Sequence, residues 1–152
     1  MTSTSPPYNL EYTELPSKTQ EDLELYKQQL EEKRNKYLDI IATFPSDQKK
    51  YTQSDRTTYN DYEEVERILR SVKLEQFRRE QNLDKMDDSK LDEIAHDAHR
   101  KARRMQNYEW DTVEHSSAEN QEGFWREIDF LEMLEEAANL EYEIRQYHNL
   151  YK

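Results

Sequence analysis

The histidines near the middle of the chain are the part of the sequence closest to a chemical motif. Glu93 and His96 form a Glu-x-x-His pair on a predicted helix, and His99 follows three residues later. Carboxylate-bridged di-iron bundles use two such pairs, together with a glutamate from each of two further helices. The second pair is missing here, because His148 has an arginine three positions before it. The sequence therefore does not complete a di-iron site.

A simpler metal site would use Asp92, His96 and His99. Their spacings of four and three residues could place them around one Zn²⁺ ion on a helix. Exposed histidines on the polar face of a helix produce the same spacing, and we adopt that interpretation. The chain has no cysteine, which excludes thiolate metal sites, disulfides and a cysteine nucleophile. We therefore predict no metal site and no cofactor.

Most catalytic motifs are also excluded by composition. Gly123 is the single glycine, so the P-loop and the dinucleotide-binding fingerprint cannot occur in their known forms. The glycine-flanked nucleophile elbow is missing as well. Pairs of carboxylates are frequent, but a chain with 34 acidic residues produces such pairs by chance. We expect a protein that is not an enzyme.

Basic residues gather in the same predicted helix as these histidines. At helical spacing His96, Arg100, Arg103 and Arg104 point away from an alanine-rich apolar stripe, and therefore outward. This basic patch could be a solvated face neutralised by the chain's own glutamates, a docking face for an acidic partner, or a phosphate contact. We favour the solvated face, because so few cations without interleaved aromatic residues bind phosphate poorly in an acidic protein.

The elements that would position these residues are helices. Of 152 residues only 34% are hydrophobic, below the ~45–50% usual for globular chains, so the core must be thin or elongated. The abundance of helix-forming residues and apolar spacings of three and four predict an elongated all-α, coiled-coil-like bundle of four helices. Residues 1–16, rich in Ser, Thr and Pro, predict a disordered tail, and 17–152 a single helical domain. The predicted helices span 17–44, 60–81, 89–107 and 118–151.

Helix boundaries come from capping signals. Ser17 with Gln20, and Asn60 with Glu63, have the form of capping boxes at the first two helix starts. Pro45 ends the first helix. We expect the second half of the last helix either to pair with helix 17–44 or to project.

The last helix carries an apolar stripe that predicts a partner surface. An unbroken three-four spacing places its side chains along one face, as a helix packed against another helix requires. Tyrosine and tryptophan near this helix add to the signal, because they are favoured at protein interfaces. The candidate partner-binding residues are Trp110, Trp125, Phe130, Leu140, Ile144, Tyr147 and Tyr151.

Charge and the absence of catalytic motifs together indicate a binding function. The net charge of -12 arises mostly after Asn107, and such a field attracts basic proteins and repels nucleic acid and anionic membranes. We expect a protein–protein interaction subunit or adaptor, a small acidic component of a larger assembly. The alternative is an acidic mimic of nucleic acid that inhibits a DNA- or RNA-binding protein. The same stripes could also join two copies of the chain into a homo-oligomer.

The expected location follows from what the sequence lacks. It shows neither a secretion signal nor an apolar run of the ~18–20 residues that a membrane span requires. We therefore expect a cytoplasmic protein, with a nuclear location left open.

Overall fold

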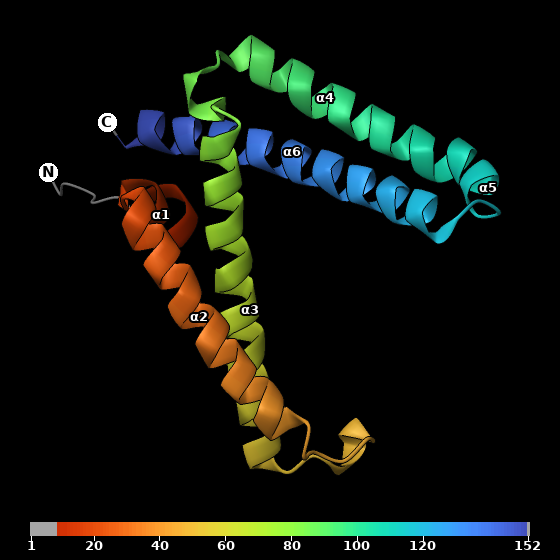
Figure 1. The fold of residues 1–152 in the computed structure, drawn as a ribbon. Coiled ribbons are helices and arrows are strands. Elements are labelled where there is room, and N and C mark those ends of the chain that lie inside the picture. Colours follow the sequence, from red (N-terminus) through yellow and green to blue (C-terminus); the bar gives the residue numbers. More distant parts are fainter. Residues whose placement is uncertain (1–8, 152) are drawn as a thin grey trace, which may run out of the picture. The chain divides into compact units, whose positions relative to one another are not determined.

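The computed structural model describes residues 9–151, and in that range the chain is built from helices without a β-strand (Figure 1). The prediction of an all-α fold with a long C-terminal helix is confirmed. The chain forms two compact units where the sequence predicted one domain. Unit 1 combines the described residues up to Pro16 with those from Phe77 onward, and unit 2 is Ser17–Gln76.

Unit 2 begins with helix α2, Gln20–Ile41. Its N-cap is Thr19, whose hydroxyl accepts a hydrogen bond from the Asp22 amide at 3.1 Å. The expected capping box at Ser17 is therefore displaced by two residues. The helix ends before Pro45, and a short 3₁₀ turn, Gln48–Lys50, lies in the exposed connection that follows.

Helix α3, Gln53–Glu80, starts earlier than its predicted boundary at residue 60. Thr52 and Asp55 form a reciprocal capping box, in which the Thr52 amide donates to Asp55 at 3.0 Å and the Asp55 amide donates to Thr52 at 3.1 Å. A threonine followed three residues later by an acidic residue is a known start signal, so this helix start was readable from the sequence.

Polar side chains join α2 to α3 within unit 2. Gln76 donates a hydrogen bond to Glu24 at 3.0 Å, and Arg34 lies 3.7 Å from Glu66. The hydrogen bond from Gln76 is the main cause of a lowered pKa of Glu24. The buried apolar residues of this unit are Leu23, Leu30, Val65, Leu69 and Val72.

Unit 1 continues from the last turn of α3, and Asn82, two residues after that helix ends, has a left-handed backbone (φ 55°). Asparagine tolerates this conformation better than most residues and often follows a helix end. A 3₁₀ turn, Leu83–Lys85, leads into α4, Asp88–Arg104, whose N-cap is Asp87. A π-helical turn, Met105–Glu109, and the short helix α5, Trp110–Val113, then lead to α6, Ala118–Leu150.

Helices α4 and α6 lie side by side along much of their length (Figure 1). The alanine stripe of α4 lies at this contact, since Ala98 and Ala102 are buried in one cluster with Phe124 and Ile128 of α6. Small side chains let two helices approach closely, which explains why a helix with few large apolar residues still holds its place.

The N-terminal segment is helical where the sequence predicted a disordered tail. A π-helical turn, Leu10–Glu14, continues into α1, Leu15–Ser17, and Leu15 is buried. The side chain of Asn9 caps this turn by accepting hydrogen bonds from the amides of Glu11 and Tyr12. Residues 1–8 of the predicted tail lie outside the described residues.

Candidate functional site

Two of the predicted partner-binding residues, Trp110 and Trp125, meet with Phe124 at one end of the α4–α6 pair. The ring centroids of Trp110 and Trp125 are 5.1 Å apart, and that of Phe124 lies 5.6 Å from Trp110 and 5.5 Å from Trp125. Phe124 is buried and Trp110 is half-buried against the same core cluster, whereas Trp125 is 43% exposed. We call Trp110, Phe124 and Trp125 the aromatic end.

Phe130 lies away from this group. It is exposed, and its ring is 5.5 Å from that of Phe77 near the end of α3, in a T-shaped arrangement. The structure therefore divides the predicted aromatic partner residues between separate places on unit 1.

Leu140 and Ile144 do not form an exposed surface, in contrast to the sequence prediction. They are only 7% and 6% exposed. The second half of α6 carries them where it contacts the π-helical turn 10–14 and the 3₁₀ turn 83–85 of the same unit. An apolar stripe looks identical in a sequence whether its cover comes from the same chain or another protein. Substitution of these two residues would therefore test folding before it tested binding.

Tyr147 and Tyr151 also have a neighbour within the chain. The ring of Tyr147 lies 5.5 Å from Tyr12 and 4.9 Å from Tyr151, and all three side chains are half-buried. Tyr12 donates a hydrogen bond from its hydroxyl to Glu143 at 2.8 Å. This hydrogen bond, with partial burial, raises the pKa of Tyr12 to about 12. The predicted tail and the predicted partner stripe thus contact each other.

A buried charge network, which the sequence analysis did not identify, lies next to this stripe. Glu141 accepts hydrogen bonds from Arg78 at 2.6 Å and from Arg145 at 2.9 Å. Arg145 also donates to Asp88 at 2.9 Å and to the carbonyl oxygens of Leu83 and Met86. Burial lowers the pKa of Arg145, but the hydrogen bonds to Asp88 and Glu141 outweigh it and leave this pKa raised. The network connects α6 to the turn between α3 and α4 and thereby stabilises the fold of unit 1.

The four residues of the predicted basic patch are brought together by α4. They line a shallow groove of about 410 Å³. We call this the arginine groove. Its lining residues are His96, His99, Arg100, Arg103, Arg104, Asn107 and Tyr108.

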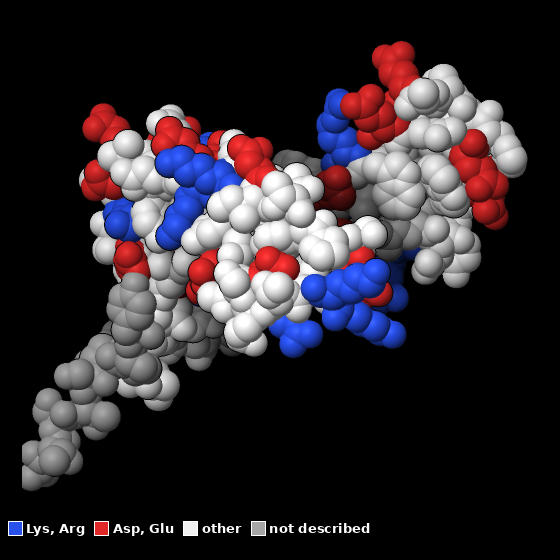
Figure 2. All heavy atoms as spheres, turned by 90° about the horizontal axis from the view of Figure 1, so that it is seen from below, with Lys and Arg blue, Asp and Glu red and all other residues white. Residues whose placement is uncertain are grey.

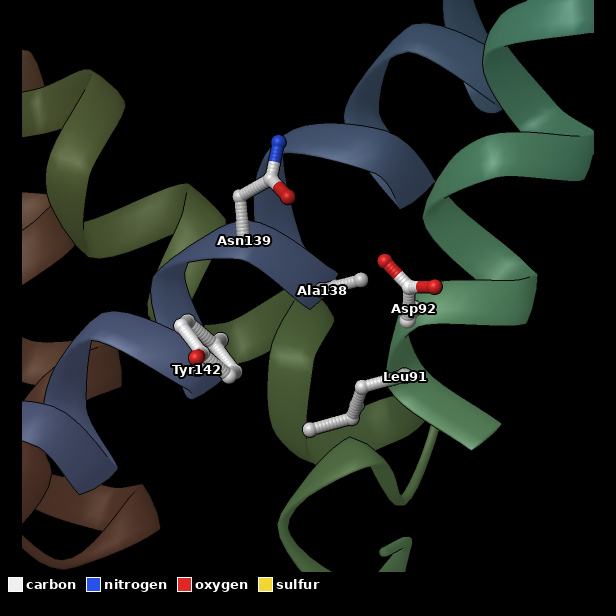
Figure 3. Close-up of a pocket in the computed structure, with 5 residues that line it drawn as sticks. All are labelled: Leu91, Asp92, Ala138, Asn139 and Tyr142. Atoms are coloured by element: carbon white, nitrogen blue, oxygen red, sulfur yellow. The ribbon is translucent and has the colours of Figure 1, made fainter. Parts of the chain in front are cut away.

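A second pocket, of about 420 Å³, lies between α4 and α6. Leu91 and Asp92 come from α4, and Ala138, Asn139 and Tyr142 come from α6 (Figure 3). The carboxylate of Asp92 and the amide of Asn139 lie across from each other, and the Tyr142 ring lies to one side (Figure 3). The lining combines one acid with an amide and a phenol, and it offers no nucleophile activated by a neighbouring base.

Metal binding receives no support from the geometry. Across residues 9–151 the structure has no group of three or more His, Asp or Glu side chains placed to hold a metal ion. His99 instead pairs with Glu135 of α6 at 3.0 Å, while His96 and Asp92 remain exposed. Within the same range no helix is both long and apolar enough to cross a membrane.

Comparison with known proteins adds no further assignment. No family model matches the sequence, and neither curated proteins nor solved structures show a significant similarity to it.

Proposed function

We propose that the protein is a non-enzymatic interaction subunit that binds a basic surface of a partner protein through its aromatic end. The observation that carries this proposal is the Trp110–Trp125 pair, in which one indole packs half-buried against the core and the other is 43% exposed. An exposed tryptophan held by packing on a helix loses little conformational freedom on binding and buries a large area.

The charge around the aromatic end supports a basic partner. Residues 108–123 contain four glutamates, one aspartate and no lysine or arginine. Glu109, Asp111 and Glu114 are exposed beside the half-buried Trp110. An apolar centre with an acidic rim favours a partner whose own apolar contact is surrounded by basic residues.

The nucleic-acid mimic is less well supported. A mimic needs a continuous surface of carboxylates that resembles a phosphate backbone. The face drawn in Figure 2 carries Lys and Arg side chains among the Asp and Glu side chains. Ion pairs such as Lys101–Glu127 and Arg126–Glu122 also neutralise carboxylates along the described part of α6.

The test compares Trp125→Ala with Tyr142→Ala, a matched control that removes another exposed aromatic ring from α6. Each tagged protein is used to isolate partners, with nuclease present, at low and at high salt. We expect partners that survive high salt to be retained by Tyr142→Ala and lost from Trp125→Ala, with an affinity decrease of roughly 30-fold or more. The thermal unfolding midpoint should stay close to that of the natural protein in both variants.

Two results would contradict the proposal. Equal recovery of the same partners by both variants would remove the aromatic end as the interface. A nucleic-acid-binding protein that is released as salt rises, and that is indifferent to Trp125, would favour the mimic instead.

A further inference from the structure

We propose that the arginine groove is a second docking surface, which binds a carboxylate-rich segment of a partner protein. This goes beyond the function proposed above, because the groove lies on α4 and uses the opposite charge. Two surfaces of opposite charge would allow the protein to bridge an acidic and a basic partner.

The first argument is that the groove contains cations without a partner in the described chain. Arg103 and Arg104 are exposed, and within residues 9–151 neither side chain forms an ion pair or a hydrogen bond. Other arginines of unit 1 are engaged, including Arg78 with Glu141 and Arg126 with Glu122. Two adjacent exposed arginines without a carboxylate leave a local positive charge on a chain that has 34 acidic and 22 basic residues.

The second argument is the arrangement of the groove along the helix. Its lining residues recur every three or four positions from His96 to Tyr108, so they form one stripe about 18 Å long. That length matches roughly three turns of a partner helix. A partner segment with carboxylates at the same helical spacing could meet Arg100, Arg103 and Arg104 together.

The third argument is that the groove is not purely basic. Tyr108 is 78% exposed, and most of the groove surface is apolar carbon. The guanidinium group of arginine pairs with a carboxylate through two parallel hydrogen bonds. The methylene carbons of arginine and a tyrosine ring can cover apolar atoms of the partner. An amphipathic acidic segment can use both properties of this surface.

Charge distinguishes an acidic protein segment from nucleic acid. Asp97 lies 3.8 Å from Arg100, and Glu135 pairs with His99, so carboxylates border the groove. A long phosphate backbone would have to run close to these carboxylates. It would also be repelled by the electrostatic field of a chain with net charge -12. A short protein segment needs to contact only the groove.

The experiment uses the full chain and a fluorescent synthetic peptide with Glu at every third or fourth position and Leu and Ala between them. Fluorescence anisotropy measures binding to the natural protein, to Arg103→Glu/Arg104→Glu and to Lys90→Glu/Arg126→Glu. The last variant has the same change in net charge at exposed positions outside the groove. A peptide of the same composition in scrambled order is the second control.

We expect the groove variant to lose affinity by roughly tenfold or more and the matched charge variant to stay close to the natural protein. Circular dichroism and thermal unfolding should show both variants folded, because all four positions are exposed. Tyr108→Ala should weaken binding without changing net charge, and Trp125→Ala should leave it unchanged. Failure of the aromatic-end proposal therefore remains distinguishable from failure of this one.

Several results would overturn the groove proposal. They include absence of saturable binding by the natural protein, equal loss in both double variants, and equal binding of the scrambled peptide. Tighter binding of a single-stranded oligonucleotide than of the peptide would make the groove a phosphate site. A dimer of the natural protein that Arg103→Glu/Arg104→Glu dissociates would make a second copy of the chain its occupant.

Discussion

Glu141 shows most clearly how single residues hold unit 1 together. It is buried, and its two carboxylate oxygens accept hydrogen bonds from different arginines, one from α3 and one from α6. A buried carboxylate is costly unless its charge is paired and its oxygens are hydrogen-bonded. The position therefore depends on both of its partners.

We predict that Arg78→Ala lowers the free energy of unfolding by about 3–5 kcal/mol. Glu141 would stay buried but would lose one of the two arginines that compensate its charge. Urea unfolding followed by circular dichroism measures this change. Arg126→Ala is the control, since it breaks an exposed pair with Glu122 and should cost about 0–1 kcal/mol. Equal effects in both variants would mean that the buried pair has no special role in stability.

At Gly123 we expect a substitution that raises the free energy of unfolding. Gly123 lies inside α6 with ordinary helical backbone, and a Cβ atom added there would have no neighbour within 4 Å. Glycine in a helix interior costs about 0.5–1 kcal/mol relative to alanine, chiefly through the entropy of the unfolded chain. Gly123→Ala should therefore raise the free energy of unfolding by about that amount in the same urea experiment. A decrease would show that this part of α6 departs from its helical conformation.

Among the elements, the contact between residues 10–17 and the end of α6 should depend on pH. The pKa of Tyr12 is raised to about 12 in the folded chain, against an ordinary value of 10.0. A raised pKa means that the folded state binds the proton more tightly, so its contribution is complete below pH 10 and is lost as pH rises through 12. The neutral hydroxyl donates to Glu143, whereas a phenolate would repel it.

We predict that this element detaches from α6 as pH rises from 10 to 12. Amide hydrogen exchange is too fast at that pH, so a fluorescent label attached beside residue 9 should report the release. Tyr12→Phe should weaken docking already at neutral pH, which increases hydrogen exchange in residues 10–17, and should remove the alkaline step. A step that persists in Tyr12→Phe would assign it to another group.

An element could be predicted where the residues that determine it lie within or beside it in the sequence. The α4 and α6 boundaries were close to the predictions because Asp87 and Ser117 cap them locally. Residues 9–16 were predicted to be disordered because their order comes from contacts such as Tyr12 with Tyr147, 135 positions further along the chain. The apolar stripe of α6 was found, but the sequence could not show that Leu140 and Ile144 are covered within the same chain.

The same difference between local signals and long-range contacts decided how much of the candidate surfaces could be predicted. The basic patch was predictable because a single helix places all four of its residues on one face. Tyr108 follows Arg104 at the same four-residue spacing, in the π-helical turn after α4, and so extends that face. The pairing of Glu141 with Arg78 was beyond reach, because nothing in the sequence distinguishes that glutamate from the many others.

At the scale of the whole molecule, unit 2 is an insertion within unit 1. The chain leaves unit 1 at Pro16 and returns at Phe77. Within unit 1 these two points are held together, because Arg79 donates hydrogen bonds to the carbonyl oxygens of Leu15 and Pro16 at 3.0 and 3.3 Å. The two ends of unit 1 that flank the insertion are therefore joined to each other within unit 1.

We predict that limited digestion with trypsin first cuts the connection between α2 and α3. Residues 45–50 are all exposed, and Lys49 and Lys50 lie in a 3₁₀ turn of three residues that a protease can unfold at little cost. Mass spectrometry of early fragments checks this. Lys49→Gln/Lys50→Gln should delay the first cut, and initial cleavage within Lys101–Arg104 instead would show that α4 opens more readily.

The contact between residues 10–14 and the end of α6 can form only after both segments have been synthesised. Tyr12 and Glu143 are 131 positions apart, so a ribosome that adds about 5–20 residues per second needs roughly 7–26 s between them. For most of that interval Leu15 has been synthesised while the part of α6 that Tyr12 contacts does not yet exist. In the newborn chain Leu15 therefore stays uncovered, and open to a chaperone, until α6 has been synthesised.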